Sequence, residues 1–95
     1  MPGGDAGAGE QVITDAGCGA CHVIPGIRGA NSTVGPPLTD WADRVYIAGA
    51  LPNRPEYLVR WLLDPQEIEP GTAMPDLFLT EQQARDASAY LFTLR

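Results

Sequence analysis

Two cysteines and the only histidine of the chain stand together, in the order Cys18-Gly19-Ala20-Cys21-His22. Two cysteines separated by two residues can add across the two vinyl groups of haem, which brings the adjacent histidine beneath the iron. A structural zinc site needs four ligands, and the chain has only two Cys and one His. A thioredoxin-type dithiol normally has a βαβ context that this sequence lacks, and a plain disulfide leaves the histidine unexplained. The motif therefore predicts one covalently attached haem c, with His22 as an iron ligand.

A second iron ligand can be sought by elimination. The chain has no Lys and no second His, and Met74 is the only methionine besides Met1. Met74 stands in the run PGTAMP, residues 70–75, which predicts a stiff loop able to hold the sulfur in a fixed place. A methionine ligand raises the reduction potential relative to a second histidine and occupies the position where a gas or substrate would bind. The alternative is that Met74 is merely buried beside a five-coordinate iron.

Length and charge limit the classes of protein and partner. The chain has 95 residues with 11 Gly and 9 Pro, which indicates one loop-rich domain whose thin core a buried macrocycle would supplement. Its net charge of −6, with Arg as the only cation besides His, disfavours nucleic acid and anionic membranes as partners. The sequence lacks an apolar run of transmembrane length and a signal-peptide pattern. We therefore expect a monomer that does not itself insert into a membrane.

The N-terminal part is expected to be a flexible segment over residues 1–8, followed by a single domain over residues 9–95. Apolar residues at helical spacing predict the first helix, over residues 10–16, and this helix leads directly into Cys18.

Two further helices are marked by capping patterns, and no alternating strand pattern appears, so the expected fold class is all-α. Asn53 as N-cap, with Glu56 three residues later, predicts a helix that ends before Pro65. Residues 65–79 are expected to form a loop. Thr80 and Gln83 form a second capping-box pair and predict a helix to the C-terminus.

Over nearly its whole length the chain resembles the class I cytochromes c. Gly35-Pro36 resembles the family's Gly-Pro pair, whose proline carbonyl accepts the proton of the ligand histidine and fixes its orientation. Arg44 stands at the spacing of the family's propionate-binding arginine, and Thr72 matches a hydroxyl beside the same propionate. Trp61 matches an aromatic residue that packs on the haem near the methionine.

Some of these residues also have plainer explanations. Arg44 could be an ordinary surface charge, because Arg is mostly exposed. Tyr46 could donate a hydrogen bond to a propionate, or could be a simple packing tyrosine. Trp41 and Trp61 could be generic core residues.

The resemblance is especially close to the cytochrome c domains fused to subunit II of some haem-copper oxidases. The sequences that carry it are LPN at residues 51–53, Trp61, DPQ at residues 64–66 and MP at residues 74–75.

The resemblance implies a cytochrome c fold, with three to five helices packed around one covalently bound haem, and an electron carrier rather than an enzyme. Its implied partners are a terminal oxidase, a cytochrome bc-type complex or a periplasmic dehydrogenase. The alternatives are the excised cytochrome domain of a larger oxidase or dehydrogenase and, less favoured, a haem-based gas sensor or enzyme. Because haem is attached to thiols outside the cytoplasm, the expected location is the bacterial periplasm, free or tethered to the membrane. The exposed haem edge is expected to be rimmed by residues 74–78 and by Gly19, Ala20, Ile24, Pro25 and Ile27.

Overall fold

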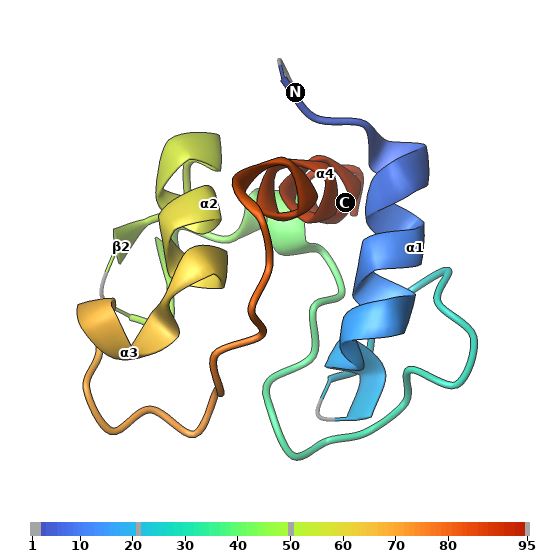
Figure 1. Ribbon diagram of the computed structural model, residues 1–95. Helices are drawn as coiled ribbons and strands as arrows, with labels where there is room; N and C mark the ends of the chain where they lie inside the picture. Colours follow the sequence, from blue (N-terminus) through green and yellow to red (C-terminus); the bar gives the residue numbers. More distant parts are fainter. Residues whose placement is uncertain (1–2, 21, 50, 95) are drawn as a thin grey trace.

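The computed structural model describes residues 3–20, 22–49 and 51–94. Within these residues the fold is helical, which confirms the all-α prediction (Figure 1). The elements follow in the order α1 (Ala6–Ala16), the 3₁₀ turns η1 (Cys18–Ala20) and η2 (Trp41–Asp43), β1 (Tyr46–Ile47), β2 (Leu51–Pro52), α2 (Pro55–Leu63), α3 (Pro65–Ile68) and α4 (Glu81–Leu91). The antiparallel pair β1–β2 was not predicted, because strands of two residues are too short to show alternation.

The first helix begins at Ala6 rather than at residue 10. Asp5 caps it, since its carboxylate accepts a hydrogen bond from the Gly7 backbone N–H (2.9 Å). The Asp5 N–H in turn donates to the Asp86 carboxylate of α4 (2.9 Å). Residues 6–8, expected from the sequence to be part of a flexible segment, are helical and follow this anchored cap.

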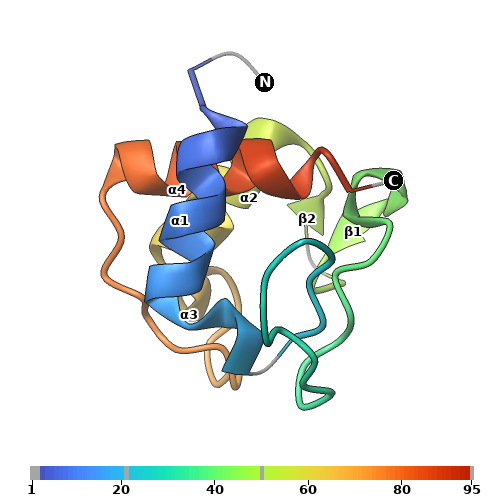
Figure 2. The same ribbon diagram turned by 90° about the vertical axis from the view of Figure 1, so that its right-hand side faces the viewer.

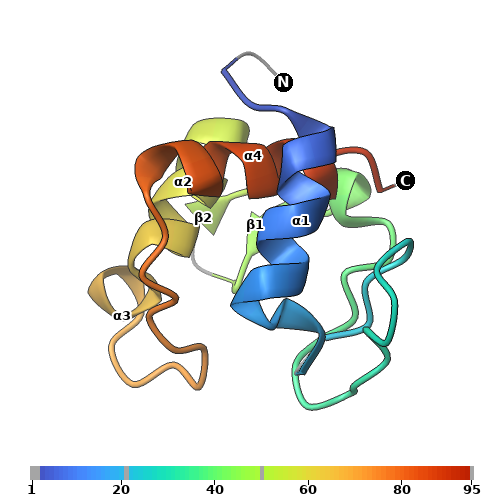
Figure 3. The ribbon, with the colours of Figure 1, turned by 45° about the vertical axis from the view of Figure 1, so that its right-hand side comes forward.

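The main contact between helices is the crossing of α1 and α4 (Figures 2 and 3). Gly9 of α1 is buried there, and a Cβ atom at this position would overlap the Asp86 carbonyl group, with the carbonyl carbon only 2.6 Å away. Ala84, Ala87 and Ser88 of α4 are also buried. Small residues on both helices thus let the two backbones approach closely. The capping box of Thr80 and Gln83 that opens α4 is confirmed.

The second helix differs from prediction at its start. Arg54, not Asn53, is the N-cap of α2, and no side chain caps the helix. The Asn53 side-chain amide instead donates to the carbonyl oxygens of Trp41 (3.0 Å) and Arg44 (3.1 Å). These two bonds fold the segment 41–53 back on itself, and the Oδ1 atom that would have to accept a backbone N–H of α2 is buried without a hydrogen-bond partner among the described residues.

A short helix, α3, occupies the start of the predicted loop 65–79. The Asp64 carboxylate caps it by accepting from the Glu67 N–H (3.2 Å), and the buried Pro65 provides its first residue. One turn of helix is too short to show periodicity in sequence.

One apolar core joins these elements. It includes Ile13, Ile24, Ile47, Leu58 and Trp61, which are all nearly inaccessible to solvent. Two long loops, over residues 22–40 and 69–79, extend below the helices on opposite sides of the molecule (Figures 1 and 3). No helix in the described part of the chain is long and apolar enough to span a bilayer.

Candidate haem site

The Cys-x-x-Cys-His segment follows directly from the end of α1. Gly17 ends the helix in the left-handed conformation (φ 76°), which an L side chain rarely adopts, and its N–H bonds back to carbonyls of the last turn. The chain then makes the turn η1, closed by a hydrogen bond from the His22 N–H to the Cys18 carbonyl oxygen (3.1 Å). Cys21 lies outside the described residues. The structure therefore places Cys18 and His22 on one compact turn at the end of α1.

The orientation of His22 is fixed by the loop that carries Gly35 and Pro36. Because a carbonyl oxygen only accepts, the 2.7 Å contact between His22 Nδ1 and Pro36 O makes Nδ1 the protonated ring nitrogen. The Nε2 atom is then left with its lone pair free to bind a metal. Gly35 lies against the same ring, since a Cβ there would be 2.5 Å from His22 Cε1. The absence of a side chain at residue 35 is what lets the ring lie there.

The loop after His22 is tied to the last helix. The Tyr90 hydroxyl of α4 donates to the Pro25 carbonyl oxygen (2.6 Å). Burial, and secondarily the negative charge of Glu10, raise the pKa of the Tyr90 hydroxyl above its usual value. The neutral, donating form is therefore favoured in the folded protein.

Met74 lies beside Trp61, which comes from α2. The buried indole N–H of Trp61 donates to Met74 Sδ (3.1 Å), and Met74 packs partly buried against the core. Thr72 is partly buried, and its hydroxyl oxygen accepts from the Met74 N–H (3.4 Å). A thioether sulfur has a second lone pair, so the indole hydrogen bond leaves one available for a metal. The structure thus brings together three of the residues predicted from the sequence.

Arg44 and Tyr46 have different surroundings. The half-buried Arg44 guanidinium lies over the Trp41 ring, 5.6 Å from its centroid, and donates to the Pro37 carbonyl oxygen. The Arg44 side chain is thus held in place by its neighbours. Tyr46 is 60% exposed on β1, and its hydroxyl has no hydrogen-bond partner among the described residues.

Trp41 is a candidate that sequence reasoning treated as a generic core residue. Its side chain is buried, yet its indole N–H has no acceptor within the described residues. An unsatisfied buried N–H costs about 1–3 kcal/mol, so a native fold normally supplies an acceptor. A haem carboxylate is such an acceptor, and an imidazole with a thioether suits haem iron. The Trp41 N–H, the His22 imidazole and the Met74 thioether therefore fit haem. The sequence alone could not have identified Trp41, because it does not show which indole N–H is left unpaired after folding.

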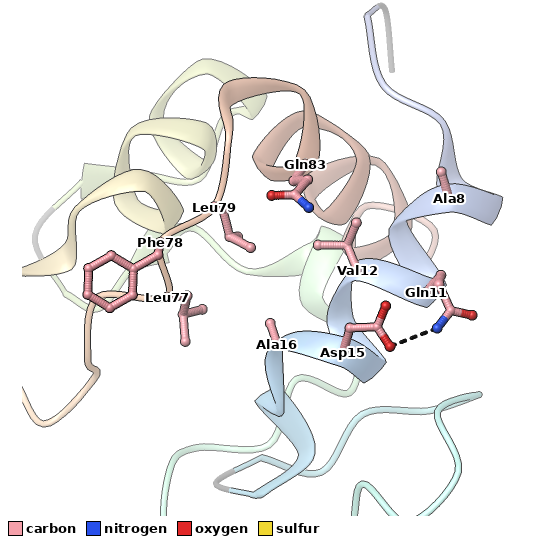
Figure 4. Close-up of a pocket in the computed structure, with 9 residues that line it drawn as sticks. All are labelled: Ala8, Gln11, Val12, Asp15, Ala16, Leu77, Phe78, Leu79 and Gln83. Carbon is pink, nitrogen blue, oxygen red and sulfur yellow. Dashed lines mark hydrogen bonds between the residues drawn. The ribbon is translucent and has the colours of Figure 1, made fainter.

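The residues predicted to surround the exposed haem edge differ in their exposure to solvent. Ile24 and Ile27 are buried in the core, so the prediction that they form an exposed rim is wrong. Phe78, by contrast, is 87% exposed and has a left-handed backbone (φ 56°). It borders an open hollow of about 470 Å³ between α1 and the segment 77–79, and its ring projects away from α1 (Figure 4). The hollow is lined by Ala8, Gln11, Val12, Asp15, Ala16, Leu77, Phe78, Leu79 and Gln83.

The helical fold, the histidine held by a proline carbonyl and the methionine held by an indole define a haem protein of the cytochrome type. The sequence profile described as "Cytochrome c" matches residues 6–95. The chain belongs to the cytochrome c family, and it is a class I c-type cytochrome. It is accordingly an electron-transfer haem protein.

Similar proteins include two curated relatives, both named cytochrome c oxidase subunit 2. The one from Alkalihalophilus pseudofirmus is 34% identical over 91 residues, which cover 95% of this chain and 26% of the relative. The one from Bacillus sp. (strain PS3) is 35% identical over 89 residues, covering 90% of this chain and 25% of the relative. The chain thus spans about a quarter of the length of these relatives.

A solved structure shares the fold. It is cytochrome c2 from Rhodobacter sphaeroides, with a TM-score of 0.72 and 23% identity, and the match covers 96% of each chain.

Proposed function

We propose that this chain carries one electron at a time on a single haem c, attached through Cys18 and Cys21 and ligated by His22 and Met74. The observation that supports the proposal is that both candidate ligand side chains are held by a neighbour: His22 Nδ1 donates to Pro36 O (2.7 Å), and the Trp61 indole N–H donates to Met74 Sδ (3.1 Å). A haem bound there supplies a one-electron iron couple. Ligands fixed beforehand need little rearrangement when the charge of the site changes, which favours rapid electron exchange.

We propose that the two propionate carboxylates of the haem are bound on the side of the molecule where η2 and β1 lie. Trp41 would donate its unpaired indole N–H there, and Arg44 would supply positive charge from its place over the Trp41 ring. Thr72 and Tyr46 remain proposed donors, and Tyr46 would have to turn inward from its exposed position.

The partner is proposed to be a respiratory redox protein, with a terminal oxidase favoured over a bc-type complex or a periplasmic dehydrogenase. The names of the two relatives support this choice. The same names support the alternative proposal, that the chain is the cytochrome domain of a larger oxidase subunit. The expected compartment is the periplasm or its equivalent. Because the chain has no Lys and exposes Phe78, docking should rest on apolar contact. Turnover with a purified haem-copper oxidase should therefore fall less with salt than that of a Lys-rich cytochrome, and an equal or steeper loss contradicts apolar docking.

Optical spectroscopy tests the ligand assignment. The ferric protein should show the weak long-wavelength band of thioether-ligated haem, the ferrous protein should not bind carbon monoxide, and acid-acetone should fail to extract the haem. Met74→Ala should abolish the band and allow carbon monoxide to bind, whereas Leu77→Ala, a truncation three residues away, should do neither. Carbon monoxide binding by the unaltered protein would remove Met74 from the iron and favour a sensor or enzyme. Extraction of the haem would refute covalent attachment.

A further inference from the structure

The loop that carries Met74 has few hydrogen bonds to the rest of the molecule. Residues 70–79 contain no helix or strand. Several of their hydrogen bonds are local, such as Thr72 N–H to Glu69 O (3.1 Å) and Phe78 N–H to the Asp76 carboxylate (2.8 Å). Apart from the Trp61 indole, the side chain from outside the loop that bonds to it, within the described residues, is Gln66 of α3.

Gln66 makes three hydrogen bonds, all to the backbone of this loop. Its Nε2 donates to the carbonyl oxygens of Thr72 (2.7 Å) and Met74 (3.2 Å), and its Oε1 accepts from the Gly71 N–H (3.0 Å). One planar amide thereby uses both of its polar atoms to hold backbone groups at residues 71, 72 and 74. The bonds thus reach the backbone of Met74 itself and of two residues just before it.

The base of this side chain is well anchored. Gln66 is the second residue of α3 (Figure 1). The start of this helix is fixed by the Asp64 cap and the buried Pro65. α3 contacts α2, the helix that supplies Trp61. Two neighbouring helices therefore hold Met74. Gln66 of α3 bonds to the backbone of its loop, and Trp61 of α2 bonds to its sulfur.

We propose that Gln66 is a positioning residue that clamps the Met74 loop and so controls how often the sulfur leaves the iron. This inference rests on the proposed function, in which Met74 is the ligand. Gln66 itself touches neither iron nor haem in this assignment; it acts through the backbone of residues 71–74. Because the clamp is exposed, its bonds compete with water and are individually weak, so the loop can open without global unfolding.

The test is the rate at which imidazole, a small competing ligand, binds the ferric holoprotein. At high imidazole concentration this rate is limited by release of Met74. Gln66→Ala should raise the saturating rate about tenfold, the factor given by three exposed hydrogen bonds at the low end of their net strength. Gln66→Glu keeps an acceptor for Gly71 but loses both donors, and should also bind imidazole faster. Gln11→Ala, a control that truncates an exposed glutamine on α1, should match the unaltered protein.

Two further measurements separate the possible failures. In urea unfolding, Gln66→Ala should lose no more than about 1.4 kcal/mol, the free energy that a tenfold factor represents, because the unfolded chain lacks the same three bonds. A larger loss would mean that Gln66 supports the whole fold and not the loop in particular, and would overturn the clamp. If Met74→Ala binds imidazole no faster than the unaltered protein, Met74 is not the ligand, and the proposed function and the clamp both fail. If Met74→Ala is fast while Gln66→Ala stays within twofold of the unaltered protein, the clamp alone is overturned.

Discussion

Replacing Gly35 with alanine tests how tightly the His22 ring is held against the loop of residues 35–36. Gly35 does not have a left-handed backbone, so an alanine can adopt its conformation without strain. The added Cβ, however, would lie 2.5 Å from Cε1, 2.8 Å from Nδ1 and 3.1 Å from Nε2 of His22. The substitution therefore acts through the ring alone.

The magnitude follows from these distances. Ordinary contact begins at 3.4 Å, so the ring or the backbone must move by about 0.9 Å. Overpacking of this kind costs about 1–3 kcal/mol. The hydrogen bond to Pro36 O, now 2.7 Å, would be stretched beyond its normal range, and its loss costs about 0.5–1.5 kcal/mol. Gly35→Ala should therefore destabilise the protein by about 2–4 kcal/mol.

The assay is urea unfolding of the ferric holoprotein, followed through the absorbance of the haem. With a urea dependence of about 1–3 kcal/mol per molar, typical of small domains, the midpoint should fall by roughly 1 M or more. Gly7→Ala is the control, since its Cβ would meet only Asp5 Oδ1 at 3.4 Å on the exposed side of α1. It should stabilise the helix by up to about 1 kcal/mol.

A loss below about 0.5 kcal/mol for Gly35→Ala, the level of an ordinary surface substitution, would refute this reasoning. It would mean that the ring and the loop of residues 35–36 can separate at little cost, and that the Pro36 carbonyl does not fix the histidine.

Three further outcomes are expected. Gly9→Ala should destabilise the protein by about 2 kcal/mol or more in urea unfolding, because its Cβ meets the Asp86 backbone at the helix crossing; a neutral result contradicts the crossing. Since the Tyr90 pKa is raised on folding, the unfolded chain loses that proton first, so stability should fall as pH rises above about 10 and be unaffected below it. The unfolding midpoint of Tyr90→Phe should therefore fall less steeply above about pH 10 than that of the unaltered protein. Equal slopes of midpoint against pH for the two proteins would contradict this role of Tyr90. Trp41→Phe should destabilise the holoprotein if a haem carboxylate accepts from the indole, whereas removing a truly unpaired N–H would be neutral or stabilising.

The parts of the site that depend on local sequence could be predicted. The spacing of Cys18 and His22 predicts that they share one turn, as the structure shows, and a count of residues able to ligate iron makes Met74 the candidate second ligand, which stays a prediction. The capping box of Thr80 and Gln83 is equally local, because both partners lie within one helical turn.

The parts that depend on distant contacts could not be predicted. Asn53 matches the pattern of a helix cap, but its Nδ2 donates to carbonyl oxygens 9 and 12 residues earlier, and its Oδ1 makes no bond to α2. α1 starts early because Asp5 meets Asp86, a residue 81 positions away in the sequence. The bonds of Gln66 and the unpaired N–H of Trp41 likewise exist only once the loops have folded.

The crossing of α1 and α4 has a consequence for how the protein can vary. The chain from Gly17 to Thr80 leaves the end of α1 and returns to the start of α4. Because these two helices are in contact, this stretch forms a single closed loop. The entropy of closing such a loop grows only with the logarithm of its length, and a doubling costs about 0.6 kcal/mol. Insertions of a few residues at the exposed turn around Gly29 should therefore be tolerated, while the small residues at the crossing leave no room for change. The stretch between His22 and Met74 can therefore vary in length as long as α1 and α4 stay in contact.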